Sequence, residues 1–154
     1  MVNATNNDLD KTDKRILNEY MADSKQTLRQ LAKKLSVSYV TVMNRIKKFE
    51  EQGIIRGYGA RVDAEKLGYQ LNVMIHVRIS KGKLRELERK IASNPHVYAV
   101  YDITGTFDCT ILARFRTTQT MDTFIKKLQT YEFVERTNTQ IILNTIKEGQ
   151  VSVR

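Results

Sequence analysis

The chain has little cysteine and no long apolar runs, and both features argue against a secreted or a membrane-spanning protein. Cys109 is the only cysteine among 154 residues, so no internal disulfide can form and we expect a reducing compartment, the cytoplasm. No stretch approaches the roughly 18 apolar residues of a membrane-spanning helix. Residues 1–14 are polar and lack the apolar core of a secretory signal peptide. The sequence therefore predicts a cytoplasmic protein without a membrane partner.

The residue groupings of an enzyme or a metal site are also missing. His76 and His96 are far apart in the sequence, and neither has a cysteine or an acidic residue at metal-ligand spacing. Neither a nucleophile motif nor a phosphate-binding loop is present. Cys109 lies in an apolar stretch, where a free cysteine behaves as a small hydrophobic residue. We therefore predict no catalytic residues, no metal and no cofactor.

Acidic residues are few relative to basic ones. Lys and Arg number 26 against 17 Asp and Glu, which gives a net charge of +9. A basic chain is attracted to polyanions, although charge alone does not choose among DNA, RNA and a membrane surface. Between residues 24 and 62, nine cations face only two acidic residues, Glu50 and Glu51. The positive charge is therefore concentrated in one segment.

Residues 27–55 of that segment show the pattern of a helix-turn-helix. Two short amphipathic helices are predicted, each with apolar residues at helical spacing on one face. The buried positions are Leu28, Leu31, Ala32 and Leu35 in the first helix and Val42, Ile46 and Phe49 in the second. Residues 36–38 make the turn and supply an N-cap, and a left-handed backbone at Ser36 is expected to be slightly strained. A helix over residues 13–21, with Leu9 and Asp10 as staple and cap, completes a three-helix unit.

The exposed face of the second helix, about residues 38–52, carries groups that suit a DNA major groove. Asn44 has the amide that pairs with adenine, and Val40 or Thr41 offers an apolar contact for a thymine methyl. Basic residues here and on the preceding helix are expected to hold phosphates. The residues predicted to contact DNA are Lys33, Lys34, Ser38, Tyr39, Val40, Thr41, Asn44, Arg45, Lys47 and Lys48. A solvated surface position remains the alternative for Asn44 and for each cation.

Beyond residues 60–68 the apolar pattern changes from helical to alternating. Strands are predicted over residues 72–80, 97–104, 109–116 and 133–146, with helices near residues 84–91 and 121–128. This βαββαβ order predicts a ferredoxin-like sandwich, in which two helices cover one face of an antiparallel sheet. The other face needs partial cover, and a second copy of the sheet is the simplest cover, so we expect a homodimer. The fold class is α+β.

Motifs spread over residues 9–147 occur in an order that is specific, although each motif alone is weak. They are Leu9-Asp10, Asp13, Ile16-Leu17, residues 31–35, Ser38, Val42, residues 45–47, residues 51–55, Gly57-Tyr58, Gly105, Asp108, residues 134–137 and Thr139. In these motifs the chain resembles the Lrp/AsnC (feast/famine) transcriptional regulators of bacteria and archaea. The resemblance implies a winged helix-turn-helix domain (residues 1–53), a hinge strand or linker (54–68) and a RAM/ACT-like domain (69–154) that dimerises and binds effectors.

The resemblance also implies further assembly and a ligand. Dimers of this family commonly form tetramers or octamers, and their effectors are usually amino acids bound between dimers near a Gly…Asp turn. Carried over, the effector residues are Gly105, Thr106, Phe107, Asp108, Thr137 and Thr139. Carboxylate, hydroxyl and open amide groups suit an amino acid. The alternative is that Gly105 serves a tight turn that Asp108 caps, and residues 117–120 lack the acid that many amino-acid responders carry.

The sequence as a whole predicts a regulator that binds palindromic promoter sites on double-stranded DNA as a dimer or higher oligomer. Three alternatives remain open. The first is an effector-independent architectural or global DNA-binding regulator, and the second is a metabolite-sensing oligomerisation module without specific DNA readout. The third is an RNA reader, since ferredoxin-like sheets also host these. RNA readers need paired aromatic residues on central strands, and Tyr98 and Tyr101 are predicted to lie on opposite faces of theirs.

Overall fold

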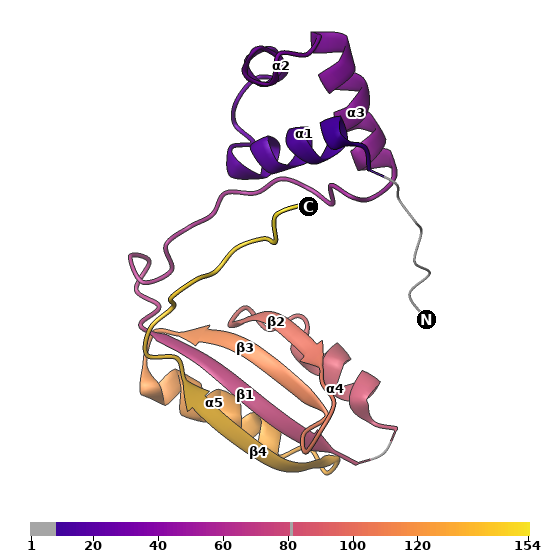
Figure 1. Ribbon diagram of the computed structural model, residues 1–154. Coiled ribbons are helices and arrows are strands. Elements are labelled where there is room, and N and C mark those ends of the chain that lie inside the picture. Colours follow the sequence, from indigo (N-terminus) through magenta and orange to yellow (C-terminus); the bar gives the residue numbers. More distant parts are fainter. Residues whose placement is uncertain (1–8, 81) are drawn as a thin grey trace. The chain divides into compact units, whose positions relative to one another are not determined.

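The computed structural model describes residues 9–80 and 82–154, which form two compact units (Figure 1). The first unit, called the head below, comprises the chain up to Arg61 together with Lys147–Arg154. The second, the sheet unit, comprises Val62–Ile146. Residues 1–8 of the predicted helix-turn-helix domain lie outside the described residues. The segment 147–154, placed with the sheet by the sequence, packs with the head instead.

Three capped helices build the head: α1 (Lys11–Ala22), α2 (Leu28–Leu35) and α3 (Tyr39–Glu51). Asp10 caps α1 and Thr27 caps α2, each through a capping box that satisfies two backbone donors at the helix start. The predicted apolar stripes meet in one core: Ile16, Leu17, Leu31, Ala32, Leu35, Val42, Ile46 and Phe49 are all buried. The predicted helices and their buried faces are therefore confirmed, except that Leu28 is only partly buried against this core.

The α2–α3 turn has the strained backbone that the sequence predicts. Ser36 adopts φ 56° and ψ 44°, and it is the one residue other than glycine with positive φ in the described chain. Its backbone N–H bonds the carbonyl oxygens of Ala32 and Lys33, which ends α2. Ser38 follows as the N-cap of α3, its side chain accepting a hydrogen bond from the Thr41 N–H. These two serines therefore fix where α3 begins and how it leaves α2.

The sheet unit is an antiparallel sheet with strand order β2-β3-β1-β4, covered on one face by α4 and α5 (Figure 1). Its elements are β1 (Leu71–Ile79), α4 (Leu84–Ile91), β2 (Val97–Asp102), β3 (Cys109–Phe115), α5 (Thr118–Gln129) and β4 (Val134–Ile141). Alternate residues of β1 and β3 are buried beneath the helices, which confirms the predicted βαββαβ fold. Cys109 is one of these core residues, and burial raises the pKa of its thiol to about 12.

The last strand is shorter than predicted. β4 ends at Ile141, which pairs with Val73, and one further backbone bond joins the Ile142 N–H to the Asn72 carbonyl oxygen. Because β1 begins at Leu71, a longer β4 has no neighbouring strand to pair with. Residues 54–68, predicted as a hinge strand or linker, form no strand and contain a turn at residues 64–68.

A register shift also changes the faces of β2. Between Val97 and Ala99 the pairing with β3 shifts by one residue, so Tyr98 does not follow strict alternation. Its hydroxyl bonds Asn72 and its ring lies under the Arg114 guanidinium, both on the sheet face without helices. Tyr101 pairs with Thr110 on that same face. The prediction that Tyr98 and Tyr101 lie on opposite faces is therefore wrong.

Candidate DNA-binding surface and candidate effector site

One face of α3 is anchored in the head core and the other is free. Val42 and Phe49 are fully buried and Ile46 is 5% exposed, whereas Asn44 and Lys47 are exposed. With roughly 100° of rotation per residue, the exposed side chains stand opposite the buried ones. The amide and the ammonium of these two residues therefore point away from the protein, as a groove-reading helix requires.

The amino-terminal turn of α3 presents two hydroxyls and an aromatic ring. Ser38 Oγ and Thr41 Oγ1 lie 2.8 Å apart and bond each other. The Tyr39 ring is 43% exposed, and the Arg29 guanidinium of α2 lies 5.7 Å from its centroid. This cation–π contact brings a cation to the start of α3 that the sequence prediction left out. It joins α2 and α3 across positions 29 and 39, a spacing that helical periodicity does not reveal.

Arg45 faces the protein instead of the exposed side. Its Nη1 lies 2.9 Å from Asp13 Oδ1 and its Nη2 lies 2.8 Å from Asp10 Oδ2. Asp13 is 1% exposed, so its charge depends on this guanidinium. The hydrogen bond from the Asp13 N–H, together with the nearby Arg45 guanidinium, holds the pKa of Asp10 below its ordinary value. A buried carboxylate and a cap residue thus hold the Arg45 guanidinium against the head, and the predicted phosphate contact of Arg45 would have to compete with them.

The other predicted cations keep solvent-facing positions. Lys34 pairs with Glu19 of α1, and Lys47 Nζ lies 3.7 Å from Glu51 Oε1 one turn along α3. Lys33 is exposed and Lys48 is half-buried. Exposed pairs of this kind are weak and readily exchanged for a phosphate. Lys33, Lys34, Lys47 and Lys48 therefore remain available to a polyanion.

Met43 was absent from the predicted set and belongs to the exposed face. It is 38% exposed and lies three residues after Val40, which is 56% exposed. The i, i+3 relation puts the two side chains next to each other on one helix face. That spacing was visible in the sequence, but a methionine reads as a core residue when it stands beside Val42.

The predicted effector turn is built around Asp108. Its Oδ2 accepts a hydrogen bond from the Ile79 N–H at 2.7 Å, and its own N–H donates to the Val77 carbonyl oxygen. Gly105 adopts φ +118°, a conformation that other residues rarely take. The Phe107 ring stacks on His76, with ring centroids 5.5 Å apart. The Asp108 carboxylate thus bonds the end of β1, 29 positions away in the sequence, and the turn itself is closed by the backbone bond from the Ile103 N–H to the Asp108 carbonyl oxygen.

The two predicted effector threonines lie on another strand. Thr137 pairs with Val77 and Thr139 with Ile75, and both belong to β4. Since Val77 also pairs with Cys109 on its other side, β1 separates the threonines from the turn of residues 105–108. Thr137 Oγ1 accepts a hydrogen bond from Gln129 Nε2 of α5. Within one chain, then, β1 lies between the two groups of predicted effector residues.

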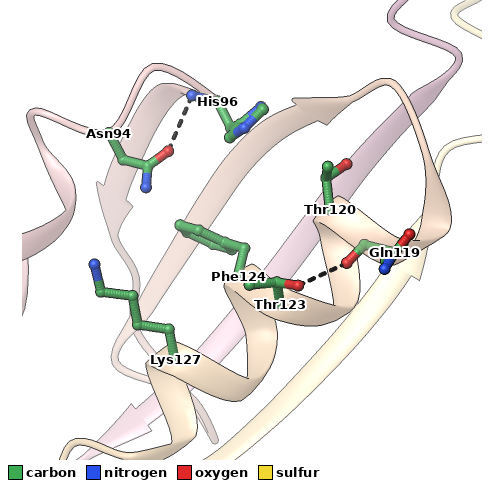
Figure 2. Close-up of a pocket in the computed structure, with 7 residues that line it drawn as sticks. All are labelled: Asn94, His96, Gln119, Thr120, Thr123, Phe124 and Lys127. Atoms are coloured by element: carbon green, nitrogen blue, oxygen red, sulfur yellow. Dashed lines mark hydrogen bonds between the residues drawn. The ribbon is translucent and has the colours of Figure 1, made fainter.

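A cavity of about 360 Å³ lies elsewhere in the sheet unit, between α5 and the segment before β2 (Figure 2). Its lining residues are Asn94, His96, Gln119, Thr120, Thr123, Phe124 and Lys127. The Phe124 ring forms its floor, and the His96 Nδ1–H donates to the Arg114 carbonyl oxygen. None of the predicted effector residues lines this cavity. It opens widely to solvent, so it encloses little of any molecule placed in it.

Two further observations concern metal binding and membrane-spanning helices. Across residues 9–80 and 82–154, no three His, Cys, Asp or Glu side chains are placed to hold a metal ion. Within those same ranges, no helix combines the length and the apolarity needed to cross a membrane.

Two family models cover most of the chain. Residues 9–56 match the family described as winged helix-turn-helix DNA-binding, and residues 72–152 match the Lrp/AsnC ligand binding domain. An uncharacterized HTH-type transcriptional regulator of Pyrococcus furiosus is 41% identical over 141 residues, which are 92% of this chain and 95% of that protein. The HTH-type transcriptional regulator FL11 of Pyrococcus horikoshii is 33% identical, over 91% of this chain and 93% of that protein.

Solved structures agree over nearly the whole length. A Neisseria meningitidis transcriptional regulator in complex with L-Met has a TM-score of 0.87 and 27% identity, covering 95% of this chain and 96% of that one. Escherichia coli AsnC has a TM-score of 0.86 and 27% identity, covering 94% and 98%. Helical head and sheet unit thus both have counterparts in the same solved proteins.

Proposed function

The chain belongs to the Lrp/AsnC family of helix-turn-helix transcriptional regulators, and we propose that it binds (pseudo)palindromic promoter sites as a dimer or higher oligomer under the control of an amino-acid effector. Membership makes it a DNA-binding regulator with a ligand-binding domain and not an enzyme. Operator symmetry, assembly and the effector are the proposed parts.

The observation that carries the proposal is the exposed face of α3. Asn44 stands on it with its amide free to meet the N6 and N7 groups of an adenine, and Lys47 lies one turn further along. Tyr39, Val40 and Thr41 lie at the helix start, where groove-entering residues are expected. Lys33, Lys34, Lys47 and Lys48 hold phosphates and so fix the register without reading bases.

Dimerisation follows from the sheet face that α4 and α5 leave open. Met74 and Leu112 pair with each other on that face and are only half-buried within one chain. A second sheet placed against them removes this apolar surface from water. Two heads related by a two-fold axis then meet inverted half-sites about one turn of DNA apart, roughly 34 Å, or a multiple of that. Tetramers or octamers add contacts and avidity.

The effector proposal places an amino acid between dimers beside Gly105, Thr106, Phe107, Asp108, Thr137 and Thr139. It is supported by the match of residues 72–152 to a ligand-binding domain and by the L-Met complex of the Neisseria regulator. Because β1 separates the turn from the threonines in one chain, a site of this kind draws on two copies. Its occupancy then favours one assembly over another and changes DNA affinity.

One observation favours a second candidate, a regulator that acts without an effector. Asp108 Oδ2 already accepts a hydrogen bond from the Ile79 N–H, which leaves less of the carboxylate for a ligand ammonium. Genomic footprinting with and without each of the twenty amino acids separates the candidates. Footprints that shift with one amino acid support the effector, and footprints indifferent to all of them support the second candidate.

The DNA proposal is tested by comparing two variants on two duplexes. Asn44→Ala is expected to lose roughly 1–3 kcal/mol on the preferred site and to relax one base position. Lys47→Ala is expected to weaken preferred and scrambled duplexes alike and to lower the salt dependence of binding by about one phosphate. Titrations at several salt concentrations measure both effects. Equal losses for both variants on both duplexes would reject this division of roles.

A further inference from the structure

Two apolar side chains stand in the middle of the surface that is proposed to meet DNA. Val40 and Met43, called the α3 apolar pair below, are 56% and 38% exposed. Neither belongs to the head core or packs against it as a partly buried member. Stability therefore gives no reason for apolar residues at these two positions.

The setting of the pair makes it different from a scattered surface hydrophobe. Single exposed apolar residues are ordinary on proteins. Here two are adjacent, and Asn44 and Lys47 lie on the same helix face. The segment of residues 24–62 that contains them is rich in Lys and Arg and has only two acidic residues. An apolar contact gains nothing from phosphates, so the pair needs an apolar feature within the DNA groove.

The major groove offers one such feature, the C5-methyl group of thymine. Building on the proposed function, we propose that Val40 and Met43 read the methyl groups of two thymines on neighbouring base pairs, beside the adenine contacted by Asn44. Three residues of helix rise about 4.5 Å, close to the 3.4 Å that separates consecutive bases on one strand. The half-site therefore contains a short A·T-rich core that is read through methyl groups as well as hydrogen bonds.

The choice of side chains fits this task. Val40 is branched and stiff, so its methyl groups are held in a fixed place near the start of α3. Met43 is unbranched and adaptable, so it follows the second methyl group where the groove departs from ideal spacing. Replacing either by alanine removes apolar contact without opening a cavity, since both side chains are exposed.

The test removes the methyl groups from the DNA. The full chain first selects its preferred duplex from a random pool, and each thymine of one half-site is then replaced singly by deoxyuridine. This substitution deletes the C5-methyl and leaves base pairing unchanged. A methyl buried from water is worth about 0.8 kcal/mol, so binding is expected to weaken about fourfold at two neighbouring positions and nowhere else in the half-site.

Protein variants then assign each methyl group to its reader. Val40→Ala and Met43→Ala are each expected to bind the thymine duplex several-fold more weakly and to lose sensitivity to uracil at one of the two positions. Met43→Leu, which keeps apolar volume, retains that sensitivity. Met21→Ala is the matched control, because Met21 is 39% exposed on α1 and belongs to the same head.

The outcomes separate this inference from the function on which it rests. Failure to select any preferred duplex contradicts the proposed function itself. Specific binding with uracil tolerated everywhere, or a selected half-site without thymine, overturns the methyl readout and leaves DNA regulation standing. Uracil effects that persist in both alanine variants assign the methyl groups to other residues and also overturn the inference.

Discussion

Arg45 and Lys47 stand two positions apart on α3 and have opposite tasks. Arg45 reaches back to the buried Asp13 and to the Asp10 cap, whereas Lys47 is exposed and bonded only within its own helix. Arg45→Gln leaves the Asp13 carboxylate without its counter-charge, so we expect a loss of about 2 kcal/mol in the free energy of unfolding. Lys47→Ala is expected to leave stability unchanged while weakening DNA binding. Urea denaturation of both variants measures the difference.

A second pair of variants checks the cause of that loss. Asp13→Asn replaces the carboxylate by a neutral amide, so adding Arg45→Gln to this variant is expected to cost much less than Arg45→Gln alone. Equal costs in the two backgrounds would mean that Arg45 acts through its stem or through Asp10 and not through Asp13.

Ser36 adopts a strained backbone conformation that glycine would adopt without strain. Its φ of 56° lies in the left-handed region, where a side chain costs about 1 kcal/mol. Ser36→Gly is therefore expected to stabilise the head by about 1 kcal/mol or slightly less, because glycine also loosens the unfolded chain. Ser38→Ala, which removes the α3 cap, is expected to change stability by a similar amount in the opposite direction. Thermal unfolding of both serine variants shows whether the signs differ.

At the residue scale, the sequence predicted what local periodicity controls. Val42, Ile46 and Phe49 are buried and Asn44 is exposed, because helical geometry fixes which side chains share a face. The partner of Arg45 lies 32 positions away on α1, and no local pattern identifies it. The face of Tyr98 was mispredicted for a related reason. A register shift depends on how two strands pair, and the sequence of one strand does not encode this.

At the scale of elements, the segment 147–154 is part of the head. The Asn18 side chain on α1 bonds Val153 twice, as its Nδ2 donates to the carbonyl oxygen and its Oδ1 accepts from the N–H, both at 2.8 Å. The Val153 side chain packs against the head core, and Arg61 Nη2 donates to the Glu148 carbonyl oxygen. Two separate stretches of chain thus complete one unit, which no strand or helix pattern predicts.

The Asn18 contact has a measurable contribution. Asn18→Ala removes both hydrogen bonds and is expected to lower the stability of α1 by about 1–2 kcal/mol, and Asn18→Asp, which keeps the acceptor, by less. Hydrogen exchange of the α1 amides reports the effect, with the β1 amides as an internal reference. Asn138→Ala on β4 serves as the control, and a similar change there would contradict a local role for Asn18.

The sequence placed every helix and strand of the sheet unit but not all of their ends. Turn and cap residues mark helix ends well, as Pro95 does after α4. Strand ends depend on the partner: with Val73 opposite Ile141, β1 has only two residues left, so β4 cannot pair as far as the predicted residue 146. The relative placement of the predicted effector residues also depends on strand pairing, since β1 lies between the turn of residues 105–108 and Thr137.

At the scale of the whole molecule, the open sheet face governs assembly. Met74 lies near its centre, between Leu112 on β3 and Gln140 on β4. Met74→Lys buries a charge if two sheets meet, so we expect sedimentation to show a monomer. Affinity for a palindromic site then falls towards that for a single half-site. Ala92→Lys beside the helix layer is the control, and a Met74→Lys protein that stays dimeric would contradict the proposed interface.

The discontinuity of the head has a consequence for how the protein is made. Val153 follows Asn18 by 135 positions, with the whole sheet unit translated between them. During synthesis, α1, α2 and α3 therefore leave the ribosome long before residues 147–154 are available to complete the head. A chain that stops after α3 lacks Val153, so Asn18 loses both of its hydrogen bonds and the head is expected to be less stable.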